Sequence, residues 1–380
     1  MKKLVVLSLV ISVIVALTQC QPDKPVTCTD CNGEEPVLYE QTPYPFEIPV
    51  GFPQPFIPAD NPMTVEGVAL GRYLFYDKNL SRDRSLSCAS CHFQGNMFGD
   101  PDPVSTGIDG QQGRRQAMVL FNLAWQEKFF WDGRAGSLEE QVVMPVTDPI
   151  ELDSDWETVI SRVSTEPTYD SLFIKAFNQE EVTQELIAKA MAQFIRTMVS
   201  ANSKYDRVIR LGQESWDAQP AAPDGRSLQE IGYNMFLTEE GDCFHCHGEQ
   251  ETSFLLGGFA PDLTFLNNGS VTDNSTDLGR EEVTNATSDF GKFKVPSLRN
   301  VSISAPYFHN GSIPDLDSLL NFYSMGGHTN KNIDPNMRKQ GVTFPRFNEL
   351  QKDALEQFIF ALSDFDFLQD TAYSNPWPAQ

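Results

Sequence analysis

The chain has 380 residues, and its 28 Lys and Arg stand against 52 Asp and Glu, which gives a formal net charge of -24 at pH 7. Such an acidic surface argues against nucleic acid and anionic membrane surfaces as partners, because both would repel it. A basic or neutral partner is compatible with it. The length leaves room for two modest domains, each with a buried core.

The N-terminus predicts an export signal over residues 1–19. A positively charged start precedes an apolar run from Leu4 to Leu17, which is too short for an ordinary membrane span. The run leads to Cys20 in a sequence that resembles a lipoprotein box, although Gln19 occupies a position where a small residue is usual. We therefore expect a periplasmic or outer-membrane-attached protein with a lipid on Cys20; a soluble periplasmic protein is the alternative.

Residues 20–59 are expected to form an extended tether, because ten prolines between residues 21 and 62 prevent helix formation. The tether would lie as a strap against the first domain. Within it, Cys28 and Cys31 form a C-x-x-C pair that Asn32, rather than a histidine, follows. In an oxidising compartment we expect a small local disulfide here, and a redox-active pair is the alternative.

The first domain is expected to begin with a helix over residues 65–77, whose apolar positions share one side. Cys88, Cys91 and His92 then form a C-x-x-C-H motif, in which two thiols bond to the vinyl groups of haem and the histidine binds the iron. A C-x-x-C pair alone would also allow a disulfide or a zinc site, but the adjacent histidine, present in two copies of the motif, argues against both. Residues 95–113 are a predicted loop beside this haem.

Two more helices are expected in this half. One follows the N-cap Ser137 and ends at Pro145; the other runs from the cap Thr183 to Met198 with apolar residues at helical spacing. The pattern then breaks, so we place a boundary between an N-terminal domain of residues 60–203 and a C-terminal domain of residues 204–368.

The second half repeats this order. A helix over residues 228–236 leads to Cys243, Cys246 and His247, a second C-x-x-C-H motif, and irregular chain follows. Further helices are expected from residue 314 to 326 and from 353 to 362, and residues 369–380 are expected to be a tail. Strand signals are few and short. The sequence thus predicts an all-α fold of two cytochrome c-like haem domains with long loops, related by duplication.

The five histidines limit the ligands of the two irons, and none lies between His92 and His245. The first domain therefore cannot offer a second imidazole, and we expect its haem to be open or water-bound, as a peroxide-binding iron must be. Methionines are the alternative ligands: Met97, Met118 and Met144. For the second haem, Tyr323, Met325 or His328 could reach the iron, and packing in the core is an equal alternative for Tyr323.

Several motifs, taken in order, resemble the bacterial di-haem cytochrome c peroxidase and MauG family. They occupy residues 70–77, 87–92, 130–135, 294–300 and 306–311. The resemblance implies a peroxidatic N-terminal haem and an electron-transferring C-terminal haem. It also implies Trp131 between the haems, Glu151 as the distal acid-base group and Gln141 in the distal pocket. Without the resemblance, Trp131 would be assigned to aromatic packing and Glu151 to a solvated loop.

The chain departs from the family pattern in three places. Many members carry a histidine in the loop after the first haem, which blocks the resting iron until the second haem is reduced. Residues 105–110 contain none, so we expect no need for reductive activation. The methionine ligand of the second haem is replaced by Tyr323, as in MauG. The family's calcium site falls on Gln116, Ser304 and Pro306, where glutamine is a longer and weaker substitute for asparagine.

We expect an enzyme with two haem c groups that reduces hydrogen peroxide with electrons from a small cytochrome c or cupredoxin. MauG-like oxidation of Trp or Tyr side chains in a partner protein is the alternative, favoured by Tyr323. A non-enzymatic di-haem electron carrier is a third hypothesis, which the scarcity of histidines in the first half argues against. The resemblance also allows a homodimer, although no residue pattern marks an interface.

Overall fold

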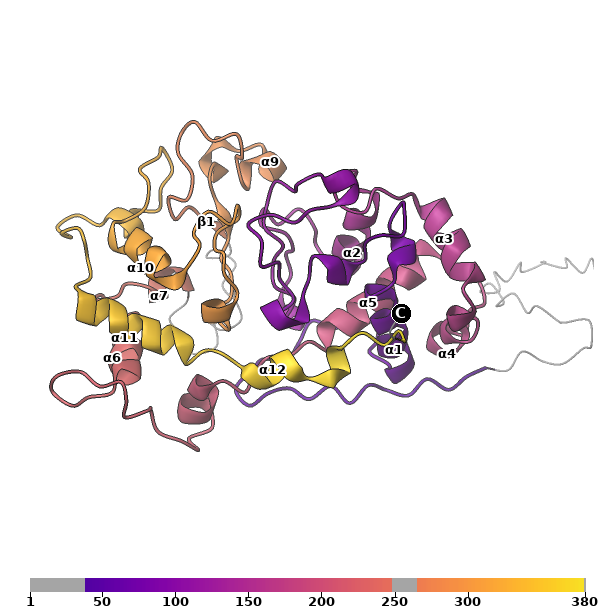
Figure 1. Cartoon of the computed structure of the whole chain (residues 1–380), viewed down its shortest axis with the longest axis horizontal. Coiled ribbons are helices and arrows are strands. Elements are labelled where there is room, and N and C mark those ends of the chain that lie inside the picture. The colour runs from indigo at the N-terminus through magenta and orange to yellow at the C-terminus, as the bar shows by residue number, and fades with distance from the viewer. Residues whose placement is uncertain (1–37, 248–264, 379–380) are drawn as a thin grey trace, which may run out of the picture. The chain divides into compact units, whose positions relative to one another are not determined.

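The computed structural model describes residues 38–247 and 265–378, which form helices and two short strands joined by long irregular segments (Figure 1). The expected export signal, Cys20 and the Cys28 and Cys31 pair lie outside these residues. The first half contains helices α1 (Val65–Phe75), α2 (Leu138–Thr147), α3 (Trp156–Thr165), α4 (Leu172–Phe177) and α5 (Gln184–Arg196). The second contains α6 (Leu228–Phe236), α7 (Phe244–His247), α9 (Glu281–Thr284), α10 (Leu316–Ser324), α11 (Glu349–Phe360) and α12 (Phe365–Gln369), with strands β1 (Phe265–Leu266) and β2 (Phe293–Lys294).

The helix-rich character with little sheet agrees with the expected class. The strands β1 and β2 form one antiparallel pair, in which Phe265 lies opposite Lys294. Residues 40–380 group together by their contacts.

In the first half, α1 packs on α5 (Figure 1). The Thr64 side chain caps α1 by accepting a hydrogen bond from the Gly67 amide at 3.0 Å. A Cβ atom on Gly71 would lie only 1.9 Å from the Ala190 carbonyl oxygen, so only glycine allows the two backbones to approach this closely. The core around this contact is fully buried and includes Leu70 and Phe194.

In the second half, α6 packs on α11 through an equivalent contact. A Cβ atom on Gly232 would lie 2.0 Å from the Ala354 carbonyl oxygen. In both halves a glycine of the helix before the haem motif therefore meets an alanine of a later helix. Duplication is one explanation for this correspondence, and it stays a prediction, as does the boundary near residue 203.

The predicted helices differ from the observed ones in several details. Helix α2 continues through Pro145 to Thr147 instead of ending there. A proline in the last turn removes only the hydrogen bond that its own amide would have made to the residue four positions earlier, so the turn survives. Helix α1 ends two residues earlier than expected and α11 begins four residues earlier. Helices α3, α4, α9 and α12 were not predicted.

The described part of the tether and the C-terminal segment both run along the first half. The Phe56 amide donates to the Ala124 carbonyl at 2.7 Å, and the Trp125 indole donates to the Pro53 carbonyl at 2.8 Å. Beyond α12, the expected tail instead packs on α1: Tyr76 donates to the Tyr373 carbonyl at 2.6 Å, and the Trp377 ring lies 5.3 Å from that of Tyr73. Burial of these aromatic side chains accounts for the difference.

Within the described ranges, no helix combines the length and apolar character that a membrane crossing requires.

Candidate active site

The first C-x-x-C-H motif begins in a 3-10 turn, Cys88–Ser90, and its two cysteines are not joined in a disulfide. The His92 Nδ1 atom lies 2.7 Å from the Phe98 carbonyl oxygen. Because Phe98 adopts a positive φ of 55°, the chain turns back toward the motif there. A histidine whose Nδ1 is held by a carbonyl presents Nε2 to a metal, so the ring is oriented as an iron ligand requires.

A cavity of about 660 Å³ opens beside this motif. Its wall includes Cys91, His92, Gln141 of α2 and Glu151. A smaller cavity of about 60 Å³ continues past Cys88 toward the core and shares all four of these residues. Cys91 and His92 at the edge of the large cavity, with Cys88 lining the small one, fit a covalently held haem.

Among the methionines considered as ligands of the first iron, Met118 lines the large cavity. Met97 is fully buried in the core and Met144 packs against that core; neither lines the cavity.

Glu151 follows α2 in a tight turn, in which the Glu151 amide donates to the Asp148 carbonyl at 3.1 Å. Burial raises the pKa of its carboxyl to about 7; the neighbouring Asp148 carboxylate raises it as well, and Arg134 acts in the opposite direction. A carboxyl group with this pKa can both accept and donate a proton near neutral pH. The loop after the first motif contacts this turn, because the Ile108 amide donates to the Glu151 carbonyl at 3.0 Å.

A second cavity, of about 160 Å³, lies at the other haem motif and is lined by Cys246, His247 and Tyr323. Cys243 also forms no disulfide and packs against the core of this half. Burial lowers the pKa of His247 to about 4, so this imidazole is neutral, as a metal ligand must be.

Of the three candidates for the sixth ligand here, Tyr323 is the one that lines the cavity, and its hydroxyl accepts a hydrogen bond from Asn268 at 3.1 Å. Met325 is 54% exposed. The His328 ring packs on Phe322 at 5.6 Å, and the residue is not part of the cavity wall.

The wall between the two cavities contains Trp131, which lines both of them. The indole donates to the Gln116 carbonyl at 3.0 Å, and the Trp131 carbonyl accepts from the Lys294 amide at 2.7 Å. Gln116 of the first half therefore holds the indole ring, and Lys294 of the second half holds the Trp131 backbone.

Comparison with known proteins agrees with this geometry. Residues 65–214 match the family model described as di-haem cytochrome c peroxidase, and residues 292–324 match a model of RoxA-like, cytochrome c-like proteins. The methylamine utilization protein MauG of Methylorubrum extorquens is 34% identical over 282 residues, which cover 74% of this chain and 75% of MauG. The chain belongs to the di-haem cytochrome c peroxidase and MauG family.

Two other relatives show the range of the family. Cytochrome c peroxidase Ccp of Escherichia coli K12 is 35% identical over 70% of this chain, but that match spans only 54% of Ccp. A crystal structure of a MauG-like protein associated with microbial copper homeostasis is 28% identical, with a TM-score of 0.77 over 88% of this chain and 100% of that one. The protein is therefore an oxidoreductase of the di-haem peroxidase type, with haem c as its cofactor.

The expected calcium ligands of this di-haem peroxidase lie together. Gln116, Ser304 and Pro306 all line the second cavity, and the Gln116 side-chain amide donates to the Pro306 carbonyl at 2.5 Å. In this arrangement the amide nitrogen, not its oxygen, faces Pro306, whereas calcium requires oxygen. A calcium site would need the amide to rotate, and it stays a prediction.

Sequence reasoning missed a buried charge network around Arg115. This guanidinium contacts Asp132 at 2.6 Å and Asp277 at 2.7 Å, and these three side chains are 8%, 4% and 11% exposed. Arg115 holds the pKa of Asp277 down at about 2. The only signal in the sequence was Asp132 inside the family motif at residues 130–135. The network links the two halves beside Trp131.

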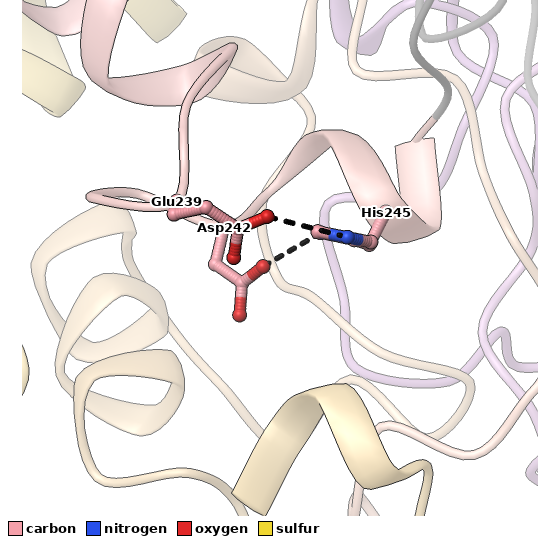
Figure 2. Close-up of side chains that lie close together, drawn as sticks. All are labelled: Glu239, Asp242 and His245. Atoms are coloured by element: carbon pink, nitrogen blue, oxygen red, sulfur yellow. Dashed lines mark ion pairs between the residues drawn. The ribbon is translucent and has the colours of Figure 1, made fainter. Parts of the chain in front are cut away.

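A second cluster lies at the start of α7, where His245 faces two carboxylates (Figure 2). Its Nδ1 lies 2.7 Å from Asp242 and its Nε2 3.6 Å from Glu239. Both Asp242 oxygens already contact cations, Lys339 at 2.7 Å and Arg346 at 2.8 Å. The charge of Asp242 is already neutralised by these two cations. We therefore interpret the cluster as a set of ion pairs that holds the second haem motif in place.

Proposed function

We propose that the protein reduces hydrogen peroxide at the haem on Cys88 and Cys91, with electrons supplied through the haem on Cys243 and Cys246. The observation that carries the proposal is Glu151, which lines the same cavity as His92 and whose carboxyl has a pKa of about 7. Haem iron, when bound, supplies a site for a peroxide oxygen and exchanges electrons one at a time.

Glu151 would move the proton that cleavage of the O–O bond requires. Hydrogen peroxide takes two electrons and two protons to give two water molecules, and one proton must pass from the inner oxygen to the leaving one. Near neutral pH the Glu151 carboxylate accepts the first proton, and the resulting acid returns it. Gln141, on the same cavity wall, would orient the peroxide by hydrogen bonding.

Electrons would cross between the cavities at Trp131. Its position in the wall of both cavities, and its fixation by Gln116 and Lys294, support this role. The electron donor would be a small cytochrome c or cupredoxin, and a basic or neutral docking surface on it would suit the net charge of -24. We place this reaction in the periplasm, with attachment to the outer membrane through Cys20 as part of the same proposal.

The loop that follows the first motif supports activity without prior reduction. Ile108 is 1% exposed, and its amide is bonded to the Glu151 turn. The loop is thus packed against the turn that presents Glu151, and it carries no histidine that could reach the iron.

The decisive experiment adds hydrogen peroxide to the isolated diferric protein without any reductant. We expect one high-spin and one low-spin haem by electron paramagnetic resonance, followed by a rapid optical change with peroxide and turnover with a small reduced cytochrome c. E151Q should slow the reaction by about 100-fold or more, whereas E157Q, at an exposed acid of α3, should not. Two low-spin haems that ignore peroxide until reduced would contradict the proposal.

MauG-like oxidation of a partner protein is the second candidate, because Tyr323 lines the second cavity while Met325 is exposed. A phenolate ligand would lower the potential of that haem and disfavour the ferrous state that a cytochrome-fed peroxidase uses. Y323F should change the spectrum of the low-spin haem, whereas M325L should leave it unchanged. Peroxide consumption without turnover of any cytochrome or cupredoxin donor would favour this second function.

A further inference from the structure

Lys294 is a buried cation in the wall between the two cavities. It belongs to β2, it is 5% exposed, and it lines both cavities together with Trp131 and Gln116. Its backbone is fixed, because its amide donates to the Trp131 carbonyl and its strand pairs with Phe265. The flexible Lys294 side chain therefore extends from a backbone position that is held in place.

No carboxylate lies within 4.0 Å of the Lys294 Nζ atom in the part of the chain that the structure describes. The ammonium donates instead to the Gln126 side-chain oxygen and lies 5.6 Å from the centre of the Phe129 ring. Burial alone lowers its pKa to about 7, with no charged neighbour contributing. Nearby buried guanidinium groups do have an acidic partner: Arg115 pairs with Asp277, and Arg299 pairs with Asp206.

A buried ammonium without an anion is unfavourable, whereas one paired with a carboxylate is tolerated. Haem carries two propionate carboxylates, which are ionised at neutral pH, and each cavity that Lys294 lines belongs to one haem motif. We propose that Lys294 binds a haem propionate in the wall between the two cavities. The inference rests on the two haems of the proposed function and not on the peroxide reaction.

The contact has an electrostatic consequence. A positive charge beside a propionate stabilises the extra electron of the reduced haem, so loss of that charge lowers the midpoint potential of the same haem. Because Lys294 lines both cavities, either haem can supply the carboxylate. The haem whose potential changes on loss of the Lys294 charge is the one that supplies the propionate.

The test uses the full-length holoprotein with both haems attached, as counted by the pyridine haemochrome spectrum. Potentials of the high-spin and low-spin haems are titrated separately in wild type, K294M and K294R. We expect K294M to lower one potential and to shift the propionate bending band of that haem in the resonance Raman spectrum. K294R keeps the positive charge, so its two haem potentials should stay near those of the wild type.

Lys292 provides a matched control two residues earlier. Its Nζ pairs with Asp289 at 3.0 Å and its side chain is 32% exposed, so K292M removes a surface charge and should change neither haem. Unchanged potentials and Raman bands in K294M would overturn the proposal, and so would an equal shift in K292M.

If K294M fails to incorporate haem, the structure of the wild-type holoprotein decides, through the presence or absence of a propionate oxygen within 3.2 Å of Nζ, roughly the upper limit of a hydrogen bond. A protein inert to peroxide that still shows the shift would refute the peroxidase function and leave this inference intact.

Discussion

Glu151 is the residue at which the chemistry can be tested most directly. Its pKa is raised to about 7, so its carboxylate form is lost as the pH falls through that value. Because the proposed first step needs the carboxylate, the rate constant for the reaction with peroxide should rise with pH and level off above about pH 7. Stopped-flow measurements across pH 5–9, roughly two units on each side of that pKa, will show this profile in wild type, and a slow, flat profile in E151Q.

Two neighbours of Glu151 should move that profile in opposite directions. D148N removes a negative charge that raises the Glu151 pKa, so the midpoint should move to lower pH; the Asn side chain keeps the oxygen that accepts the Ile150 amide at 2.9 Å. R134Q removes a positive charge that lowers the pKa, so the midpoint should move to higher pH. If both variants shift the midpoint in the same direction, the pH profile belongs to a group other than Glu151.

At the scale of elements, the loop over residues 99–115 is fitted to the Glu151 turn through Gly107. A Cβ atom there would lie 1.8 Å from the Ile150 carbonyl oxygen, so G107A must separate the loop from the turn. We expect a loss of about 1–3 kcal/mol in the free energy of unfolding and a slower peroxide reaction. G113A, in the same loop, meets no atom closer than 3.6 Å and should behave as wild type in denaturant titration and stopped-flow assays. Equal behaviour of the two variants would contradict this account.

Elements with local signals were predictable. The caps Ser137 and Thr183 and the apolar spacing of neighbouring residues are local signals; the caps predicted the starts of α2 and α5, and apolar spacing predicted α1. Helix α6 was also predicted without a cap, and Ser227 before it makes no side-chain cap hydrogen bond. Helix α3 has such a cap in Asp155 and could have been recognised, whereas α4 has only six residues and little periodicity. The haem motifs are local as well, because five consecutive residues carry each one.

At the scale of the whole molecule, the missing information is long-range pairing. Arg115 and Asp277 are 162 residues apart, and Arg72 reaches the Ser374 carbonyl across 302 residues. A single sequence contains no periodic signal for such contacts. Lys294 was noticed only as part of a family motif, since its burial and lack of a nearby acid appear only once both halves are folded.

The Arg115 network should therefore contribute strongly to stability, in a way that pH reveals. R115M leaves the buried Asp277 carboxylate without its cation, while Asp132 keeps Arg134 at 3.1 Å, and it should cost about 3–5 kcal/mol. R114Q removes an exposed pair with Glu282 and should cost about 0–1 kcal/mol. The Asp277 pKa is depressed to about 2, so its stabilisation is complete above its unfolded value, near 3.9, and is lost as the pH falls through about 2. The stability difference between wild type and R115M should shrink over that range, as chemical denaturation at pH 7, 4 and 2.5 can measure. A difference that stays constant with pH would mean that Arg115 acts through packing alone.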